Sequence, residues 1–155
     1  MSQYAASLPS DGTVPKDIAS FFSDFYKISD TEAAHEDYAD ALTSDGVLTM
    51  GSKRVTGRAG QSLSSPYILA LRKAMWEKVS SRSHYPLKIF SFAPLSEEGG
   101  EVMLYGTVDY GLRDGKKAEG IEWAARAKLV RVEVRLRMSE YQVYLDPGAM
   151  AAKAK

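Results

Sequence analysis

His84 is the residue whose chemistry stands out in this chain of 155 residues, which contains two histidines. An imidazole has an ordinary pKa of about 6.5, so it can exchange a proton near neutral pH and serve as a general acid or base. His84 lies between helix-like segments and strand-like runs. If its side chain faces a pocket, we expect a catalytic histidine. The alternative is a histidine that only hydrogen-bonds at the edge of a sheet.

Aromatic side chains form a second group of candidates. If they converge, they line an apolar pocket with a few polar tips, which is the usual make-up of a small-molecule site. The hydroxyls of Tyr26, Tyr38 and Tyr110 would then hydrogen-bond a carbonyl or hydroxyl of the ligand. The alternative is ordinary core packing. The candidates for substrate binding are Phe22, Tyr26, Tyr38, Trp76, Tyr110 and Trp123.

Composition narrows the classes of partner. Lys and Arg number 20, as do Asp and Glu, and this zero net charge argues against a nucleic-acid partner. It also gives no electrostatic attraction to a membrane. The absence of cysteine excludes thiolate ligands and fits a cytoplasmic protein. No metal-ligand cluster or glycine-rich phosphate loop is recognisable, so we expect neither a metal nor a cofactor.

The first half of the chain is expected to be helical. Ser29 and Glu32 have capping-box spacing, which predicts a second helix from about residue 30 to about residue 44. A short hairpin over residues 47–56 and a third helix over about 66–80 follow. Helical spacing predicts the first helix, which starts near residue 15 and carries on one face Ile18, Phe21, Phe22, Phe25 and Tyr26.

The second half is expected to be antiparallel sheet. Alternation predicts strands over residues 85–92 and 102–112. Residues 120–146 also alternate, but at ~3.3 Å per residue one strand of that length would span roughly 85–90 Å, too long for this domain. The apolar phase switches near residues 130–133, where we place a turn. It switches again near Ser139, where we place a bulge.

The local register decides where His84 points. If it faces inward, strict alternation also turns Pro86 and Lys88 inward, and turns Ile89 outward. Proline cannot donate to a strand ladder and favours an edge or a bulge. A bulge at Pro86 would reset the phase, so that His84 and the later apolar residues all face inward.

The order of these elements predicts an α+β fold, with helices on one face of a curved antiparallel sheet. We expect one domain over residues 14–146, which is long enough to bury a core. Residues 1–13 are expected to form a disordered leader, and residues 147–155 a flexible tail.

Several stretches carry a resemblance to a known family: "FFSDFY", "LRKAMWEKVSSRSHYPLKIF", "EVMLYGTVDYGL", "EWAARAKLV" and "YQVYLD". With the order of elements, they make the chain similar to the NTF2-like superfamily over roughly residues 14–146, and more narrowly to the SnoaL-like proteins common in filamentous fungi. The resemblance implies a cone, in which three helices wrap a bent antiparallel sheet around a deep apolar pocket. Members of the family include cyclases, dehydratases and isomerases, and also non-catalytic binding modules.

The resemblance also implies acid–base roles for two residues. His84 stands at about the place where scytalone dehydratase-like members have a catalytic histidine, but strand 102–112 contains no histidine to act as its usual partner. Asp109 is the nearest match to the strand aspartate of polyketide cyclases. Its alternation with Val108 and Tyr110 favours a position facing solvent or a subunit interface instead.

The resulting hypothesis is a cofactor-independent isomerase, cyclase or dehydratase that acts on an apolar polyketide- or terpenoid-like molecule. The alternative is a non-catalytic small-molecule-binding or dimerisation module of the same fold. The outward face of the sheet, which carries Met103, Tyr105 and Thr107, is where we expect a homodimer contact.

Overall fold

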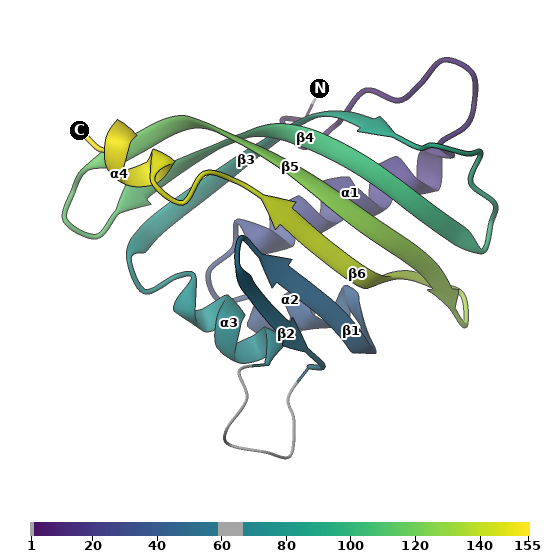
Figure 1. Cartoon of the computed structure of the whole chain (residues 1–155), viewed down its shortest axis with the longest axis horizontal. Coiled ribbons are helices and arrows are strands. Elements are labelled where there is room, and N and C mark those ends of the chain that lie inside the picture. The colour runs from purple at the N-terminus through teal and green to yellow at the C-terminus, as the bar shows by residue number, and fades with distance from the viewer. Residues whose placement is uncertain (1, 59–66) are drawn as a thin grey trace.

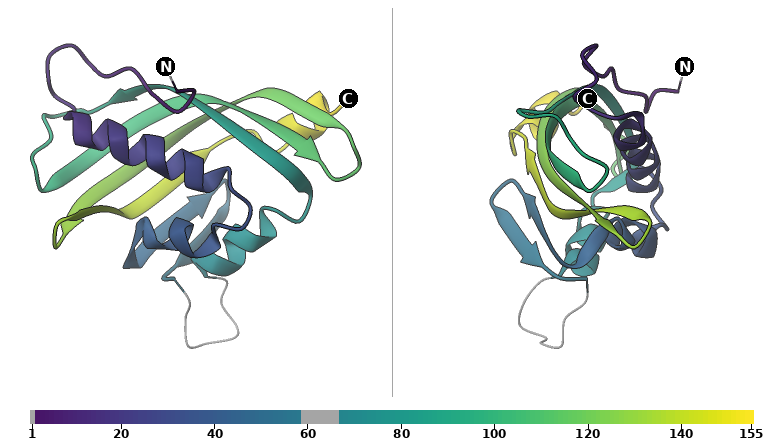
Figure 2. Two further views of the ribbon diagram at one scale, coloured as in Figure 1. Left: turned by 180° about the vertical axis from the view of Figure 1, so that it is seen from behind. Right: turned by 90° about the vertical axis from the view of Figure 1, so that its right-hand side faces the viewer.

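A computed structural model describes residues 2–58 and 67–155. Its centre is a curved six-stranded sheet with strand order β2-β1-β6-β5-β4-β3. Figures 1 and 2 show the sheet curling around α1, which crosses its concave side, with α2 and α3 on the same side. This arrangement confirms the predicted α+β class. The strands are β1 (Leu42–Met50), β2 (Lys53–Thr56), β3 (Val79–Phe90), β4 (Gly99–Leu112), β5 (Lys117–Val132) and β6 (Arg135–Tyr144).

Helix α1 (Lys16–Ser29) forms where the sequence predicts it. Four apolar residues of its inward face are almost completely buried and lie among the sheet side chains: Ile18, Phe22, Phe25 and Tyr26. Burying an aromatic or aliphatic side chain of this size stabilises the fold by about 1.5–3 kcal/mol. The packing also fixes the C-terminal end of α1, so that Ser29 and Asp30 lie beside β3.

The next two helices are shorter than predicted. Helix α2 spans only His35–Asp40, and no capping box forms because Ser29 still belongs to α1. Leu42 begins β1, which pairs with β6 in parallel. Helix α3 (Ile68–Ala74) ends early as well, since Val79 begins β3. In both places the spacing of apolar side chains also fits a helix. These residues form strands because pairing across the sheet satisfies their backbone N–H and C=O groups. The predicted start of the third helix near residue 66 lies outside the described residues.

The turn and the bulge predicted within residues 120–146 are confirmed. Glu133 and Val134 separate β5 from β6, and the register shift opposite Lys128 and Leu129 leaves Ser139 unpaired. Glu133 has a φ of 60°, a left-handed conformation that is unfavourable for a residue with a side chain. Neither glycine nor asparagine marks this turn, so the change of apolar phase is its signal in the sequence.

We expect Glu133→Gly to stabilise the protein by about 0.5–1 kcal/mol. Glycine adopts positive φ without steric cost, although its greater freedom in the unfolded chain offsets part of the gain. Urea denaturation measures the change. Glu133→Ala is the matched control, because it removes the carboxylate and keeps the strained backbone. An equal gain from alanine would show that charge, and not conformation, sets the effect.

Both ends of the chain contact the sheet. Ser7 of the N-terminal segment forms two backbone hydrogen bonds with the edge strand β3, through Leu87 and Ile89. At the other end, helix α4 (Ala149–Lys153) packs against β5, and Lys155 exchanges two backbone hydrogen bonds with Lys117. Within the described residues, no helix has the length and hydropathy of a membrane-spanning segment.

Candidate active site

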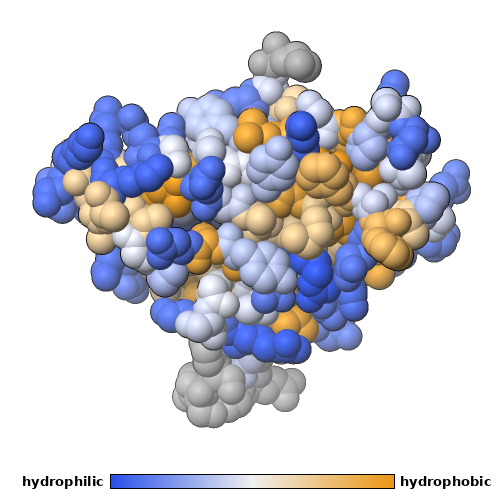
Figure 3. Space-filling model, turned by 45° about the horizontal axis from the view of Figure 1, so that its top comes forward, coloured by the Kyte–Doolittle hydropathy of each residue, from blue (hydrophilic) through white to orange (hydrophobic). Residues whose placement is uncertain are grey.

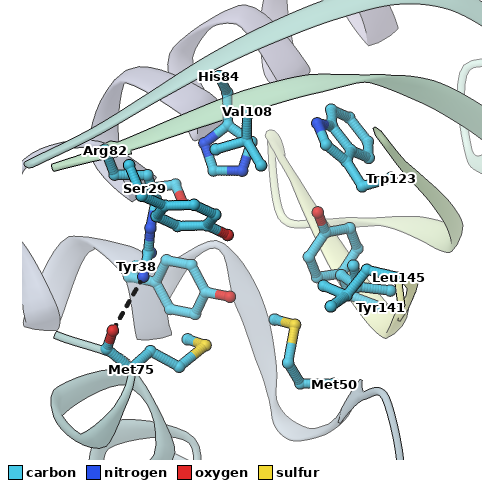
Figure 4. A pocket seen from close by; sticks show the side chains of 12 residues that line it. Ser29, Tyr38, Met50, Met75, Arg82, His84, Val108, Trp123, Tyr141 and Leu145 are labelled. Carbon is cyan, nitrogen blue, oxygen red and sulfur yellow. Dashed lines mark hydrogen bonds between the residues drawn. The ribbon is translucent and has the colours of Figure 1, made fainter. Parts of the chain in front are cut away.

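A cavity of about 50 Å³ lies between the concave face of the sheet and the helices (Figure 4). This volume is room for a few water molecules, whereas small-molecule sites usually enclose about 300–1,000 Å³. Met50 and Met75 form part of its wall, and their flexible side chains could move to admit a larger molecule. Polar residues that line the cavity include Ser29, Tyr38, Arg82, His84, Tyr110 and Tyr141.

The bulge beside Pro86 that would let both His84 and the later apolar residues face inward is present, and it accounts for the direction of His84. Pro86 pairs with Gly106 and Lys88 with Tyr105, so Leu87 is the extra residue. Before the bulge His84 and Pro86 face inward; after it Ile89 does. Gly106 permits this geometry, because a Cβ atom there would clash with the backbone of Tyr85 and Pro86. The imidazole therefore points from β3 into the cavity (Figure 4).

Asp30, the C-cap residue of α1, holds His84 through two contacts. Its Oδ1 lies 2.5 Å from Nδ1 of the imidazole, and its Oδ2 accepts a hydrogen bond from the His84 backbone N–H at 2.7 Å. Both side chains are largely buried, with 13% of His84 and 5% of Asp30 exposed. A carboxylate at Nδ1 favours the tautomer in which Nδ1 carries the proton and Nε2 has a free lone pair. This arrangement makes Nε2 a proton acceptor.

The pKa of His84 lies below its ordinary value of 6.5. Burial is the largest cause, because it disfavours the charged imidazolium. The hydrogen bond and charge of Asp30 raise the pKa, while the guanidinium groups of Arg82 and Arg72 lower it. The net direction is downward, so the imidazole is neutral at pH 7 and can accept a proton.

Arg72 fixes the end of α1 that carries Asp30. This α3 side chain is fully buried and donates hydrogen bonds to the carbonyls of Ser29 at 2.7 Å, Thr31 at 2.7 Å and Ile28 at 3.2 Å. Of these three carbonyls, those of Ile28 and Thr31 also accept backbone hydrogen bonds, from Thr31 and Ala34, and the guanidinium adds a charged donor to all three. Because two of them flank Asp30 in the chain, Arg72 sets the position from which the carboxylate reaches His84.

The N-terminal segment covers the outer side of this pair. Gln3 donates a hydrogen bond from Nε2 to the His84 carbonyl at 3.1 Å. The neighbouring Tyr4 has a pKa raised to about 12, by burial first and then by the charge and hydrogen bond of Asp30. Both contacts place residues of the expected leader beside the Asp30–His84 pair.

Tyrosine hydroxyls supply neutral hydrogen-bond donors around the imidazole. Burial raises the pKa of Tyr38 to about 12 and that of Tyr141 well above 10, so both keep their protons at neutral pH. The hydroxyls of Tyr141 and Tyr26 lie 2.9 Å apart. The Tyr26 ring contacts the His84 ring, with centroids separated by 4.9 Å.

Several solved structures have a fold similar to that of this chain. A candidate aromatic ring hydroxylase from Novosphingobium aromaticivorans matches with a TM-score of 0.71 and 16% identity over 88% of this chain and 90% of that one. A candidate scytalone dehydratase from the same organism gives 0.69 and 13% over 84% and 83%. The hexachlorocyclohexane dehydrochlorinase LinA-type3 from Novosphingobium barchaimii gives 0.65 and 16% over 83% and 84%. No family model and no curated protein sequence matches the chain.

The chain has the NTF2-like fold. At these identities the structural similarity shows the fold alone. The names of the matching proteins also differ in chemistry, since they include a hydroxylase, a dehydratase and a dehydrochlorinase. The chemistry of this NTF2-like chain must therefore be argued from its own residues.

The NTF2-like cone brings three of the six predicted aromatic residues to the cavity wall, namely Tyr38, Tyr110 and Trp123. The other three lie behind it. Tyr26 contacts His84 and Tyr141, and Phe22 packs in the core against Tyr26. Trp76 stacks on the guanidinium groups of Arg72 and Arg82, at 5.2 and 4.7 Å.

Asp109 lies outside the set of residues that line the cavity. Its Oδ1 accepts a hydrogen bond from the backbone N–H of Gly120 at 2.7 Å. This contact spans the register shift between β4 and β5, where Val108 and Tyr110 pair with Ile121 and Ala118. The carboxylate thus stabilises a local irregularity of the sheet, and we leave Asp109 out of the mechanism below.

Three site residues are not among the sequence-based candidates: Asp30, Arg82 and Tyr141. Arg82 could have been found, because it lies two residues before His84 and so shares its face of the strand. Asp30 gives no comparable signal, since Ser-Asp-Thr at residues 29–31 has the composition of a helix cap. Within residues 2–58 and 67–155 no group of three or more side chains has the arrangement of a metal site.

Proposed function

We propose that the protein is a cofactor-independent acid–base enzyme that moves a proton on an apolar small molecule, with His84 as its base. The observation that carries this proposal is a neutral imidazole, held at Nδ1 by the buried carboxylate of Asp30, whose ring faces a cavity. The apolar wall suits a polyketide- or terpenoid-like compound. Tyrosine hydroxyls suit a carbonyl or hydroxyl oxygen on that compound.

In the proposed reaction, Nε2 of His84 takes a proton from a carbon next to a substrate carbonyl. The electron pair of the broken C–H bond moves to the carbonyl oxygen, where the hydroxyls of Tyr38, Tyr110 or Tyr141 stabilise the developing charge. Asp30 stabilises the imidazolium through Nδ1–H. Return of the proton to another carbon gives isomerisation, and its transfer to a departing hydroxyl releases water.

The comparisons agree with this chemistry in a limited way. A dehydratase and a dehydrochlorinase are named among the similar structures, and both names denote an elimination. An elimination can begin with proton removal from carbon by a base such as the one that Asp30 and His84 form. The isomerase, cyclase and dehydratase alternatives share this first step.

A probe of carbon acidity tests the proposed base without the natural substrate. A base that removes the ring C–H proton of 5-nitrobenzisoxazole breaks its N–O bond and releases a coloured cyanonitrophenolate. We expect the wild-type protein to accelerate this reaction over buffer. We expect His84→Gln to lower the protein-dependent rate by about 10²-fold or more, since a positioned general base contributes about 10²–10⁴-fold.

His35→Gln is the matched control, because His35 lies on α2 and does not line the cavity. It should keep the wild-type rate. If wild type and His84→Gln react equally fast, His84 is not the base. If the probe quenches the fluorescence of Trp123 in the wall but is not converted, the protein is better described as a small-molecule-binding module.

We also propose that a second copy of the chain covers the outward face of β3 and β4. Figure 3 shows apolar side chains gathered there. Four large apolar residues are between 37% and 47% exposed: Leu87, Phe90, Met103 and Tyr105. The zero formal net charge places no overall repulsion between two copies.

Light scattering tests the homodimer. Wild type should have twice the mass of the chain, and Tyr105→Glu should shift the mass toward that of the monomer, because a carboxylate at this position would be buried between copies. Lys27→Glu, on the exposed side of α1, should leave the dimer intact. A monomeric wild type at high concentration would contradict the proposal.

A further inference from the structure

Arg82 is the charged residue of the cavity that the proposed mechanism does not use. It lies on β3 two positions before His84 and is 8% exposed. Its Nη2 donates a hydrogen bond to the Met75 carbonyl at 3.2 Å (Figure 4). Its buried Nε has no partner among the residues that the structure describes. The guanidinium lies over the rings of Trp76 and Tyr110, at 4.7 and 5.7 Å.

The charges around the cavity do not balance. Asp30 is the buried carboxylate beside the imidazole, and both its oxygens contact His84. Arg72 and Arg82 are both buried, and in the described part of the chain neither forms an ion pair with a carboxylate. Glu32, the next acidic residue along the chain, is half exposed and pairs with Arg113. With His84 neutral, one carboxylate against two guanidinium groups leaves an excess of one positive charge.

An excess buried charge is costly unless a partner satisfies it. Arg72 donates hydrogen bonds to the carbonyls of Ile28, Ser29 and Thr31, and only its Nε lacks a partner among the described residues. Arg82 makes a single hydrogen bond, and it borders the cavity, which Arg72 does not. The unsatisfied part of the excess therefore lies at Arg82. An anionic oxygen in the cavity would neutralise it and accept a charge-assisted hydrogen bond.

We propose that Arg82 binds a negatively charged oxygen of the ligand, and that the substrates are apolar monoanions such as aromatic carboxylates. This inference rests on the proposed function for the location of the site, although anion binding does not require that His84 be catalytic. The apolar wall would contact the ring, and the charged end would lie against β3 beside His84. Trp76 and Tyr110 hold the guanidinium in this position through their ring faces.

Benzoate and benzamide form a matched pair of probes, because they share shape and differ in charge. Calorimetric titration at pH 7.5 should show that wild type binds benzoate about tenfold or more tightly than benzamide, as expected for one charge-assisted contact. Arg82→Met should abolish this preference and retain benzamide binding, which also shows that the variant is folded. Arg82→Lys should keep part of the preference.

Equal affinities of wild type for the two probes would overturn the inference, and so would a preference that survives in Arg82→Met. If Arg82→Met does not fold, Arg82→Lys and the wild-type comparison decide the question. His35→Gln, outside the cavity, should keep the preference for benzoate. The two proposals are therefore tested separately. A preference for benzoate without turnover of 5-nitrobenzisoxazole would support the anion site and contradict the base. Turnover without that preference would support the base and contradict the anion site.

Discussion

Asp30→Asn should lower turnover of 5-nitrobenzisoxazole by about 10²–10⁴-fold, while the protein stays folded. The carboxylate accepts from Nδ1–H and so leaves the Nε2 lone pair toward the cavity. An amide can instead donate its N–H to Nδ1, which places the proton on Nε2 and removes the acceptor. It also carries no charge to stabilise the imidazolium. Steady-state kinetics should show the loss mainly in kcat, because the probe does not contact Asp30.

The matched control is Asp24→Asn, the same change on the same helix at an exposed position. It should keep the wild-type rate. If Asp30→Asn also keeps that rate, the Asp30 carboxylate does not orient the imidazole for proton transfer. The assignment of His84 as a base oriented by Asp30 would then be wrong.

The pH profile provides a second measure of the same pair. Only the neutral imidazole accepts a proton, so the wild-type rate should rise as pH increases through the pKa of His84. That pKa lies below 6.5, so the rate should be level near neutrality. Asp30 is the group that raises this pKa. Its neutralisation should therefore move the rising limb to lower pH, in addition to lowering the plateau. A limb that moves upward would contradict this account of the electrostatics.

Arg72→Met should destabilise the protein by about 3 kcal/mol. Methionine keeps part of the packing against Tyr38 and Trp76, but it removes the charged donor from three carbonyls at the end of α1, and the Ser29 carbonyl accepts no other hydrogen bond from the described residues. Hydrogen bonds that involve a charged group contribute about 1.5–3 kcal/mol each, and the relief of burying a guanidinium offsets part of the total. The pKa of Arg72 is lowered to about 10 by burial, so the side chain is charged at neutral pH.

Urea denaturation measures this loss of stability, and two further variants serve as comparisons. Arg72→Lys should lose less stability, since one ammonium can reach some of the carbonyls. Lys73→Met, at the exposed neighbouring position, should change stability by no more than about 0.5 kcal/mol. A loss below about 1 kcal/mol for Arg72→Met would show that the end of α1 is held by its apolar packing and not by Arg72.

The sequence by itself determined the features that depend on local periodicity. The side chains of a strand alternate between two faces, so each change of phase marks a turn or a bulge. This rule located the turn near residues 130–133 and the irregularity near Ser139, and it showed that a bulge at Pro86 would let both His84 and the later apolar residues face inward. Helical spacing placed α1 in the same way, whereas His84 drew attention by the chemistry of its imidazole. The α+β class followed from the order of these elements.

The tertiary structure decided which groups meet. Asp30 is 54 residues from His84 in the chain, and their contact depends on where the end of α1 packs against β3. Arg72 reaches that end from α3, and Leu42 belongs to a strand because it pairs with Met138. Such contacts join segments whose local patterns are independent of one another. Alternation can show that His84 faces inward, but only the packing of the helices shows which charge lies beside it.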